Sequence, residues 1–382
     1  MRVLHVYRTY YPDPPGGLQE AIRQIALATT RKGIENRIFA LSINPARSEI
    51  VRQEGRVFRS KSWIAPASCD LGGAEAFRMF VGLVKWADVL HYHYPWPFAD
   101  LLHAVARPKQ PAVITYHSDI VRQRRLGQVY RPLMMHTLKS MAAIVATSPM
   151  YAQTSPVLSE PILRERVCVI PLGVDESSYP RAGDETVLKR LGLGEAEPFF
   201  LFIGVLRYYK GLHVLIKAAE PVRAHVVIAG SGPEESKLRI QAQAEGAGNI
   251  LFAGQISVAE KVALLRRCRA VVLPSHLRSE AYGMVLVEAA MFAKPMISCE
   301  IGTGTSYVNK DGETGFVVAP GSPPALASAM TRLLSDQALA NRLGQKARQR
   351  YQQLLSGNAL GTAYVDLYRR LARSFIGGLN TA

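Results

Sequence analysis

The sequence lacks apolar runs of the length that a membrane helix requires. Runs such as FFLFI, at residues 199–203, stop well short of the roughly 18 residues that a membrane-spanning helix needs. The amino terminus also lacks a signal-peptide pattern, because Arg2, His5 and Arg8 interrupt a strand-like MRVLHVYRTYY. The sequence therefore predicts no membrane span, and a cytoplasmic location is the expectation.

Cysteine is scarce as well. The four cysteines lie far apart and show no C-x-x-C spacing: Cys69, Cys168, Cys268 and Cys299. This distribution argues against a zinc site or a disulfide framework and predicts reduced, mostly buried thiols. With 48% hydrophobic and 20% charged residues, the composition also excludes a disordered chain.

Acidic residues are few relative to basic ones. Asp and Glu number 30 against 46 Lys and Arg, which gives a formal net charge of +16. Such a balance predicts an acidic partner: nucleic acid, a phosphorylated ligand or an anionic membrane. A basic, well-solvated surface with no partner is the plain alternative.

Strand-like and helix-like segments alternate along a chain of 382 residues, a length that suits two domains. The predicted strands of the first half are Val3–Tyr7, Arg37–Leu41, Asp88–Tyr92, Ala112–Tyr116, Ala143–Thr147 and Arg166–Ile170. Those of the second half are Phe199–Val205, Ala224–Ala229, Asn249–Ala253, Ala270–Pro274, Met296–Cys299 and Gly315–Val318. Such alternation predicts parallel sheets covered by helices on both faces.

The predicted architecture is α/β, with two Rossmann-like, doubly wound domains facing across a cleft. The first domain is expected at residues 1–175 and the second at 176–359, and a final helix at about 360–382 is expected to pack back on the first. The segment from Pro171 to Pro198, rich in Gly, Pro and charge, is interpreted as the connection between them. Ligands of such folds bind at the carboxyl ends of the strands.

Loops at those strand ends carry glycine, cations or carboxylates. They are GG in YYPDPPGGLQE, RYYKG, GSGPE, SEAYGMVLVEAAMFAKP and EIGTGTSYV. Glycine at a strand-to-helix turn lets backbone N–H groups approach a phosphate or a sugar. Five such loops along one edge of two sheets favour a phosphorylated ligand.

The fourth of these loops contains two glutamates, Glu280 and Glu288. Glu288 lies in an apolar helix-like run. Burying an unpaired carboxylate there would cost roughly several kcal/mol of desolvation free energy. A vicinal diol such as a ribose would supply two hydrogen bonds to it. Glu280 precedes the turn at Gly283 and is expected to face the group attached beyond the phosphates.

These loops, taken in order, resemble those of the retaining GT-B glycosyltransferases of family 4, whose signature of two glutamates separated by seven residues matches EAYGMVLVE. The resemblance covers nearly the whole chain. Its other motifs are Gly16-Gly17, DVLHYHYP (88–95), TYHSD (115–119), VIPLGVD (169–175), Lys210-Gly211, AGSGPE (229–234) and DGETGFVV (311–318).

The resemblance implies roles for particular residues. Glu288 would bind the ribose, Glu280 the donor sugar, and Lys210 the leaving diphosphate. The implied catalytic positions are His117, Arg207, Lys210 and Glu280. The implied donor-binding positions are Gly16, Gly17, Ile256, Gly283, Met284, Val285, Leu286 and Glu288. His117 would face the reacting sugar or the acceptor.

One position departs from the family pattern, which usually has arginine directly after the glycine at the strand end. Here Val205 follows Gly204, and the arginine is Arg207. If the strand continues, residues 205 and 207 point to the same side, because side chains alternate with period two. Arg207 could then serve from one pleat further on.

No metal and no other cofactor are expected. His91 and His93 share a strand face, but no third ligand lies near them in the sequence, and hydrogen-bonded structural histidines are the alternative. No Asp-x-Asp pair occurs, although enzymes that hold a nucleotide-sugar through a divalent ion commonly use one. Cations and helix N-termini would take that role.

The segment PMISCEIGTGTSYVNKDGETGFVV (295–318) is similar to bacterial mannosyl- and rhamnosyltransferases of O-antigen and related polysaccharides. The resemblance therefore implies a GDP-linked mannose or D-rhamnose donor and a lipid-linked saccharide acceptor. Two other functions remain open. A sugar-nucleotide epimerase has a similar fold but needs no acceptor, and a nucleic-acid-binding protein would fit the charge, although no nucleic-acid module is recognisable.

A lipid-linked acceptor would require the enzyme to reach the inner face of the cytoplasmic membrane. The segment RQRRLGQVYRPLMMHTLKS, residues 122–140, is the candidate docking surface. Its cations are Arg122, Arg124, Arg125, Arg131 and Lys139, and its expected apolar side is Val129, Leu133, Met134 and Leu138. Anionic lipids attract such cations by roughly 1 kcal/mol each. Alternatively, the apolar residues pack inside the domain.

Overall fold

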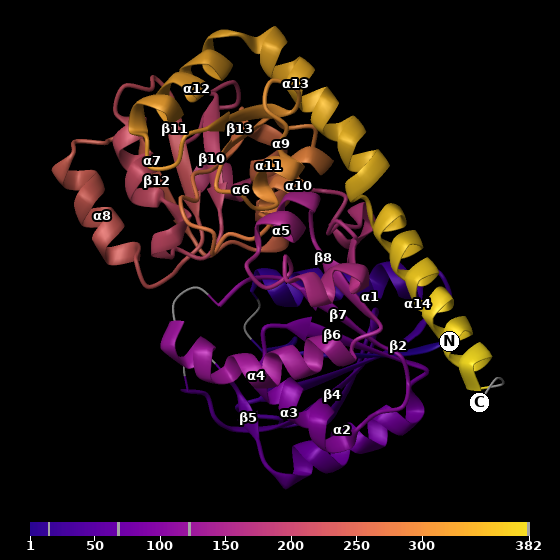
Figure 1. Cartoon of the computed structure of the whole chain (residues 1–382). Helices are drawn as coiled ribbons and strands as arrows, with labels where there is room; N and C mark the ends of the chain where they lie inside the picture. Colours follow the sequence, from indigo (N-terminus) through magenta and orange to yellow (C-terminus); the bar gives the residue numbers. More distant parts are fainter. Residues whose placement is uncertain (14–15, 67–68, 121–123, 380–382) are drawn as a thin grey trace. The chain divides into compact units, whose positions relative to one another are not determined.

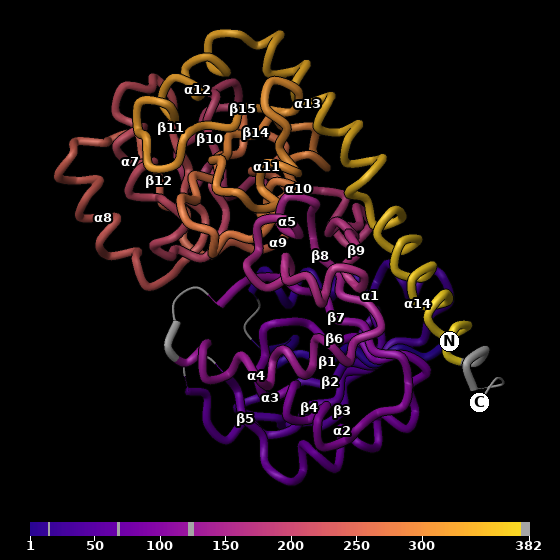
Figure 2. The backbone as a smooth tube through the Cα atoms, viewed as in Figure 1, coloured from indigo at the N-terminus to yellow at the C-terminus, as the bar shows by residue number. Residues whose placement is uncertain are grey.

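The computed structural model describes residues 1–13, 16–66, 69–120 and 124–379, and it divides into two compact units (Figures 1 and 2). Unit 1 comprises Met1–Leu172 and Gly357–Ala382, and unit 2 comprises Gly173–Ser356. The division therefore falls slightly before the expected residue 175, and the returning segment begins before residue 360. Each unit is an α/β structure built on its own sheet.

Unit 1 contains a nine-stranded sheet. Its strands are β1 (Arg2–Val6), β2 (Glu35–Ser42), β3 (Glu49–Arg52), β4 (Gly55–Ile64), β5 (Leu71–Gly72), β6 (Val89–Tyr94), β7 (Ala112–Tyr116), β8 (Ala143–Ala146) and β9 (Val167–Val169). Their order is β3-β4-β2-β1-β6-β7-β8-β9, with β5 paired to β4. All neighbours are parallel except β3 and β5, which run antiparallel to β4.

The six expected strands of this half are present, and β3, β4 and β5 were not expected. The sequence of β4, GRVFRSKSWI, carries three cations and no long apolar run, so it does not look like a buried strand. It nevertheless pairs with β2 over six residues. Arg56 and Lys61 are exposed, and the buried Arg59 guanidinium lies 3.5 Å from the Asp13 carboxylate, so the charges of this strand are solvated or paired.

Helices cover the sheet of unit 1, and they include the last helix of the chain. They are α1 (Gly17–Thr30), α2 (Ala74–Trp86), α3 (Pro97–Ala106), α4 (Arg124–Ser140), α5 (Pro149–Thr154), the short η2 (Pro161–Arg166) and α14 (Gly357–Leu379). At Gly361 in α14, a Cβ would come within 2.5 Å of the Ala28 carbonyl oxygen in α1. The two helices therefore approach closely, and α14 buries Tyr364 and Tyr368 completely in unit 1.

Unit 2 contains a six-stranded, wholly parallel sheet in the order β12-β11-β10-β13-β14-β15. Its strands are β10 (Phe199–Ile203), β11 (His225–Ala229), β12 (Ile250–Gly254), β13 (Ala270–Leu273), β14 (Met296–Cys299) and β15 (Gly315–Val318). Its helical segments are η3 (Glu176–Ser178), α6 (Thr186–Arg190), η4 (Tyr208–Lys210), α7 (Leu212–Ala219), α8 (Glu235–Ala244), α9 (Val258–Arg267), α10 (Met284–Met291), α11 (Thr305–Val308), α12 (Pro323–Ser335), α13 (Gln337–Arg350) and η5 (Tyr351–Leu355). The six expected strands match in position.

The interpretation of residues 171–198 as an interdomain connection is wrong for most of its length. From Gly173 onwards this segment belongs to unit 2, and α6 packs against α9. A Cβ on Gly183 would lie 2.7 Å from the Ala263 backbone nitrogen, and Val187 is fully buried. This glycine- and proline-rich, charged segment is therefore a folded part of unit 2, in which Gly183 allows two backbone segments to approach closely.

Two further expectations concern the whole chain. Among the helices of the described residues, none combines the length and the apolar character required to cross a membrane. The four cysteines are free thiols, of which Cys268 and Cys299 are buried and Cys69 and Cys168 are partly buried. The absence of disulfides is as predicted.

Candidate active site

The loops at the carboxyl edge of the unit 2 sheet lie against one another through glycines. Gly230, after β11, has φ +130°, and a Cβ there would lie 2.0 Å from the Gly204 carbonyl oxygen, after β10. Gly211, after η4, has φ +72°, and a Cβ would lie 2.0 Å from the Pro274 carbonyl oxygen, after β13. No side chain fits at either contact, so these glycines hold the edge together.

Helix α10 follows β13; Glu280 lies in the loop just before it and Glu288 lies within it. Gly283 precedes the helix with φ +83°, a conformation that favours glycine, and the first turn begins at Met284. Met284 and Val285 begin the helix, at the end that favours an anion, whereas the Leu286 N–H already donates to the Gly283 carbonyl oxygen at 2.9 Å. Glu280 and Glu288 are both buried, with 8% and 5% of their surface exposed.

Glu280 is ion-paired with Lys210, the last residue of η4. The Ser275 hydroxyl also donates to the Glu280 carboxylate, at 3.3 Å. Burial alone would lower the pKa of Lys210, but the adjacent Glu280 carboxylate outweighs it and raises that pKa, so the ammonium stays charged. The predicted sugar-binding and phosphate-binding residues are therefore in direct contact.

Glu288 has two partners, neither of them among the residues predicted for the site. The Tyr179 hydroxyl donates to Glu288 Oε1 at 2.5 Å, and Lys261 Nζ lies 2.7 Å from the same oxygen. The buried Glu288 carboxylate is therefore paired by groups of the protein itself. Tyr179 lies in the segment that was taken for a connection, so no sequence signal pointed to it.

Lys261 could have been found from a capping signal. Ser257 accepts a hydrogen bond from the Glu260 N–H at 3.1 Å, and the Glu260 carboxylate accepts from the Ser257 N–H at 2.7 Å. This capping box fixes the start of α9, which places Lys261 in the first turn. The predicted base-contact residue, Ile256, is half-buried in the loop just before it.

Arg207 does not extend a strand, so the premise of its predicted role is wrong. β10 ends at Ile203, and residues 205–207 form a loop whose Leu206 N–H donates to the Ser231 carbonyl at 3.0 Å. Leu206 is buried while Val205 and Arg207 are exposed, so both do lie on the outer side of this loop. The pKa of Lys210 is raised overall, and the positive charge of Arg207 acts against that rise, which indicates that Arg207 lies near the ammonium.

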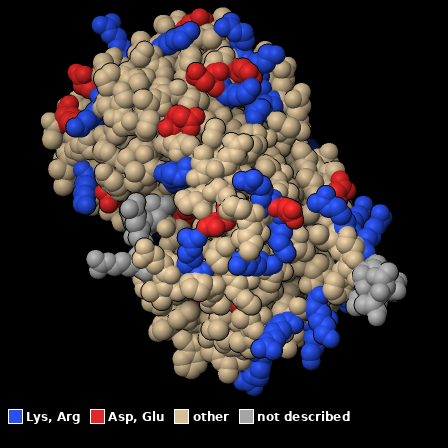
Figure 3. Space-filling model, viewed as in Figure 1, with Lys and Arg blue, Asp and Glu red and all other residues tan. Residues whose placement is uncertain are grey.

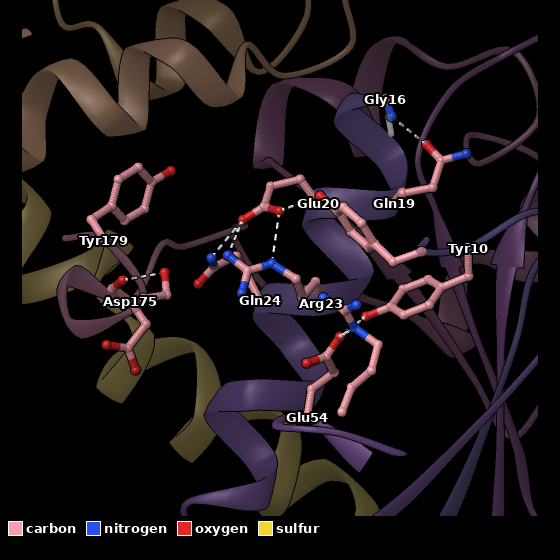
Figure 4. A network of polar contacts seen from close by, with 12 residues as sticks. Tyr10, Gly16, Gln19, Glu20, Arg23, Gln24, Glu54, Asp175 and Tyr179 are labelled. Carbon is pink, nitrogen blue, oxygen red and sulfur yellow. Dashed lines mark hydrogen bonds and ion pairs between the residues drawn. The ribbon is translucent and has the colours of Figure 1, made fainter. Parts of the chain in front are cut away.

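Gly16 and Gly17 open helix α1 in unit 1 (Figure 4). The Gly16 N–H donates to Gln19 Oε1 at 3.0 Å, and Gln19 Nε2 donates to Thr9 Oγ1 at 2.7 Å, so Gln19 ties both ends of this loop. A Cβ on Gly16 would lie 2.9 Å from Gln19 Oε1, whereas Gly17 is exposed and meets nothing. Gly17 is therefore the residue with open space beside it.

A buried polar network supports the same helix. Glu20 accepts hydrogen bonds from Tyr11, Arg23 and Gln24, at 2.7–2.9 Å, as Figure 4 shows in part. The Tyr10 hydroxyl donates to Glu54, which is 1% exposed, at 2.9 Å. These contacts hold the start of α1 in one position.

His117 lies directly after β7 and is buried within a group of histidines. His117 Nε2 lies 3.0 Å from His93 Nδ1, and His93 Nε2 lies 3.0 Å from His5 Nδ1. Burial lowers the pKa of His117 to about 3 and that of His5 to about 4. It also lowers the pKa of His91 and His93 well below the usual value, so the group is neutral.

The third histidine near His91 and His93, which no sequence spacing revealed, is therefore His5 from β1. These three rings bring their nitrogens within 4.8 Å of one another. All their ring nitrogens have hydrogen-bond partners: His91 pairs with Tyr368 at 2.6 Å and Thr115 at 2.7 Å, and the others pair among themselves and with Asn36. The alternative of hydrogen-bonded structural histidines describes this arrangement.

The predicted membrane segment is only partly as expected. Residues 121–123, including Arg122, lie outside the described residues, and the side chains of Arg124 and Arg125 are likewise not described. Of the four residues expected on the apolar side of α4, Met134 and Leu138 are buried, Leu133 is partly buried and Val129 is exposed. Leu126, which was not among them, is exposed as well. Lys139 is exposed and Arg131 is ion-paired with Glu160.

Basic side chains are spread over the molecule rather than confined to one loop. Figure 3 shows Lys and Arg scattered across the visible face of the chain, with Asp and Glu less abundant, as the net charge of +16 requires. Of the predicted residues, Gly16, Gly17 and His117 belong to unit 1 and all the others to unit 2. The structure joins Lys210 to Glu280 and leaves Glu288 with Lys261.

Two family descriptions match the sequence: "Glycosyltransferase Family 4" over residues 15–178 and "Glycosyl transferases group 1" over residues 184–350. The chain is 41% identical over 374 residues to O-antigen chain mannosyltransferase C of Escherichia coli, which covers 98% of this chain and 100% of that protein. It is 44% identical over 357 residues to D-rhamnosyltransferase WbpZ of Pseudomonas aeruginosa, which covers 93% of this chain and 92% of that one.

Solved structures share the fold. Sucrose-phosphate synthase from Thermosynechococcus elongatus superimposes with a TM-score of 0.80 at 22% identity, covering 98% of this chain and 99% of that one. WaaG, a glycosyltransferase involved in lipopolysaccharide biosynthesis, does so with a TM-score of 0.67 at 18% identity, covering 96% and 99%. The predicted GT-B architecture of two Rossmann-like domains is confirmed at the level of the fold.

Proposed function

Since the chain belongs to the family 4 glycosyltransferases, we propose that it transfers mannose or D-rhamnose from a GDP-sugar to a lipid-linked glycan in bacterial O-antigen synthesis. One observation carries the proposal: two buried carboxylates, Glu280 just before α10 and Glu288 within it, are each ion-paired with a lysine. The names of the two relatives support a hexose as the group transferred.

Unit 2 supplies the groups that a nucleotide-sugar requires. The Glu288 carboxylate would accept both hydroxyls of a ribose diol, and its contacts with Tyr179 and Lys261 hold it in place for this. The helix start after Gly283 would bind phosphate oxygens. Lys210 would neutralise the diphosphate as the sugar leaves, which is where negative charge develops.

The ion pair between Lys210 and Glu280 gives this step its geometry. Glu280 would hold hydroxyls of the donor sugar, so the Lys210 ammonium paired with it would lie beside both the sugar and the diphosphate. Arg207 adds a second, exposed positive charge near the first. These cations and the α10 N-terminus take the place of a divalent ion in the proposed mechanism, which retains the anomeric configuration through front-side attack.

Unit 1 would bind the acceptor. Gly17 leaves open space at the start of α1, which suits the close approach of a sugar or phosphate. His117, neutral and at the carboxyl end of β7, would bind a hydroxyl of the reacting sugar or acceptor.

A donor assay tests the proposal directly. Purified protein is incubated with membranes as the source of acceptor and with GDP-mannose, GDP-rhamnose or UDP-glucose, in the presence and absence of EDTA. We expect transfer from a GDP-sugar with or without EDTA, and the anomeric configuration of the product, read by NMR, to match the donor. Transfer from UDP-glucose alone would refute the guanosine assignment.

A matched pair of variants links activity to the site. Glu280→Gln breaks the ion pair with Lys210 and should abolish transfer. Glu313→Gln breaks the exposed pair with Lys310, in the same unit, and should leave transfer unchanged. Equal activity of both variants would show that the buried pair is not the reaction centre.

The same assay separates the transferase from an epimerase. An epimerase would convert the sugar of its nucleotide donor without any acceptor. We expect no change in the sugar unless membranes are added, and conversion of a UDP-sugar in their absence would favour the epimerase.

We also propose that unit 1 docks on the cytoplasmic face of the membrane through α3 and α4, which contact each other. Leu126 and Val129 on α4 and Val105 on α3 are more than half exposed, and Lys139 provides a cation nearby in the sequence. Exposed apolar groups beside cations suit reversible binding to anionic lipid.

Vesicle co-sedimentation tests this docking. The wild type should sediment with vesicles of phosphatidylcholine and phosphatidylglycerol, and less so with phosphatidylcholine alone. Val129→Ser should weaken sedimentation, whereas Ile240→Ser, at an exposed position of unit 2, should not. Equal binding by both variants would exclude this surface.

A further inference from the structure

A ladder of polar side chains crosses four adjacent strands of unit 1. Asn36 lies on β2, His5 on β1, His93 on β6, and His117 at the end of β7, and these strands are neighbours in that order. In the strand register, Asn36 pairs with Val3, His5 pairs with His91, and His93 pairs with Thr115. On each strand, the next member of the ladder is therefore two residues further along than the residue paired with the previous member. Because side chains alternate with period two, all four lie on one face.

The members are joined by three hydrogen bonds. Asn36 Oδ1 lies 3.2 Å from His5 Nε2, His5 Nδ1 lies 3.0 Å from His93 Nε2, and His93 Nδ1 lies 3.0 Å from His117 Nε2. A neutral imidazole has one nitrogen that donates and one that accepts. The direction of every bond in the ladder therefore follows once the direction of one is known.

Asn36 fixes that direction. Its Nδ2 contacts the Ala26 carbonyl at 2.9 Å and the hydroxyls of Thr29 and Thr30 at 3.0 and 2.9 Å. The Thr29 hydroxyl already donates to the Ile25 or Ala26 carbonyl, and the Thr30 hydroxyl donates to the Glu54 carbonyl. All three groups can only accept from Asn36, so its NH₂ must face them and its carbonyl oxygen must face His5.

We propose that Asn36 sets the tautomer of His117 through His5 and His93, and thereby presents His117 Nδ1 to the substrate as a hydrogen-bond acceptor. His5 donates from Nε2 to the Asn36 oxygen and so accepts on Nδ1. His93 then donates from Nε2 to His5 and accepts on Nδ1, and His117 donates from Nε2 to His93. The remaining nitrogen of His117, Nδ1, carries a lone pair.

Burial keeps the ladder neutral, which the argument requires. The four side chains are at most 5% exposed, and burial lowers the pKa values of the three histidines. A bare Nδ1 binds a hydroxyl by accepting a hydrogen bond from it, and it cannot donate one to a phosphate oxygen. This step of the inference rests on the proposed function, because a sugar hydroxyl is the group that His117 would bind.

Nuclear magnetic resonance of the full chain, labelled with ¹⁵N-histidine and free of ligand, tests the ladder. Long-range proton–nitrogen correlations distinguish a protonated ring nitrogen from a bare one, and His→Gln variants assign the signals. We expect His5, His93 and His117 all to be protonated on Nε2 and bare on Nδ1 at pH 7. A proton on Nδ1 of His117 would overturn the proposal.

Variants test whether Asn36 is the origin. Asn36→Leu removes the acceptor, and His5→Phe interrupts the ladder one step later. In either variant, the ratio of the Nε2-protonated to the Nδ1-protonated tautomer of His117 should fall by about fivefold, the factor that one ordinary hydrogen bond supplies. Thr30→Val is the matched control, because Asn36 keeps its contacts with Ala26 and Thr29. An unchanged His117 spectrum in both folded Asn36→Leu and His5→Phe would refute the role of Asn36.

Activity provides a separate readout. With a GDP-sugar donor, Asn36→Leu should lower kcat/KM by about fivefold while the Kd for GDP stays unchanged, because unit 2 holds the nucleotide in the proposed function. Thr30→Val should change neither. If the wild type transfers no sugar, the proposed function fails, whereas the tautomers measured without substrate still decide the ladder. If the His117 tautomer changes in Asn36→Leu but kcat/KM stays normal, the proposed effect of that tautomer on substrate binding is refuted.

Discussion

Lowering the pH from 7 to 5 should destabilise unit 1 strongly, because its buried histidines cannot accept protons while folded. The pKa of His5 is lowered to about 4 and that of His117 to about 3 by burial, against about 6.5 for an exposed histidine in the unfolded chain. The unfolded chain therefore binds more protons below pH 6.5. Stability is complete above that pH and is lost as the pH falls towards 4 and 3.

The size of the effect follows from those shifts. Each of the two residues should remove about 2 kcal/mol of stability between pH 7 and pH 5, or about 4 kcal/mol together. His91 and His93, whose pKa values burial also lowers, act in the same direction. This loss is comparable with the roughly 5–15 kcal/mol of a typical domain.

Two other buried groups in unit 1 act in opposite senses. Burial raises the pKa of Asp100, so folding gains from its protonation as the pH falls. Burial lowers the pKa of His103 to about 4, which has the contrary effect. The histidines of the ladder therefore determine that unit 1 loses stability as the pH falls.

Urea unfolding followed by tryptophan fluorescence measures this change in one unit. The three tryptophans, Trp63, Trp86 and Trp96, all lie in unit 1, so the signal reports on that unit. The midpoint should fall markedly between pH 7 and pH 5. His117→Gln should remove about 2 kcal/mol of the fall. Midpoints that stay constant over this range would refute the reasoning.

The remaining predictions concern unit 2. Glu288→Gln should weaken GDP binding about tenfold, since a charged hydrogen bond to the ribose becomes neutral, while Glu280→Gln spares GDP; equal losses by isothermal titration would contradict these roles. Lys210→Ala should lower kcat by about 10²–10³, the range for losing one charge-stabilising donor, and Arg207→Ala should lower it less; a larger loss at Arg207 would reverse their order. Gly211→Ala should lower the melting temperature of unit 2, because its Cβ would lie 2.0 Å from the Pro274 carbonyl oxygen, and an unchanged value in calorimetry would disprove that contact.

The local structure around α10 could be predicted because it lies within one continuous segment. Glu280, Gly283 and Glu288 are close in the chain, so a single helix start defines their spacing. The strands of unit 2 were predicted in place because both faces of its sheet are covered, which makes each strand an apolar run. β4 was not predicted because it lies near the sheet edge and its charged residues interrupt any apolar run.

Contacts between distant segments could not be predicted in the same way. Tyr179 reaches Glu288 across 109 positions, from a segment whose glycine and proline content indicates a loop. The H-x-H pattern of β6 was visible, but the link from Asn36 through His5 depends on strand order and register. One sequence without register information does not specify either.

The place of α14 in unit 1 has a consequence for how the protein is made. The last helix supplies Tyr364 and Tyr368, whose hydroxyls bond Thr115 and His91 in the buried face of the first sheet. Domains generally fold as units while the ribosome delivers the chain from its amino terminus. Here the unit that is begun first is completed last. Unit 2 can fold before α14 has been translated. A ribosome that stalls before residue 357 would hold a nascent chain in which His91 lacks its Tyr368 partner and the surrounding apolar surface is open to chaperones.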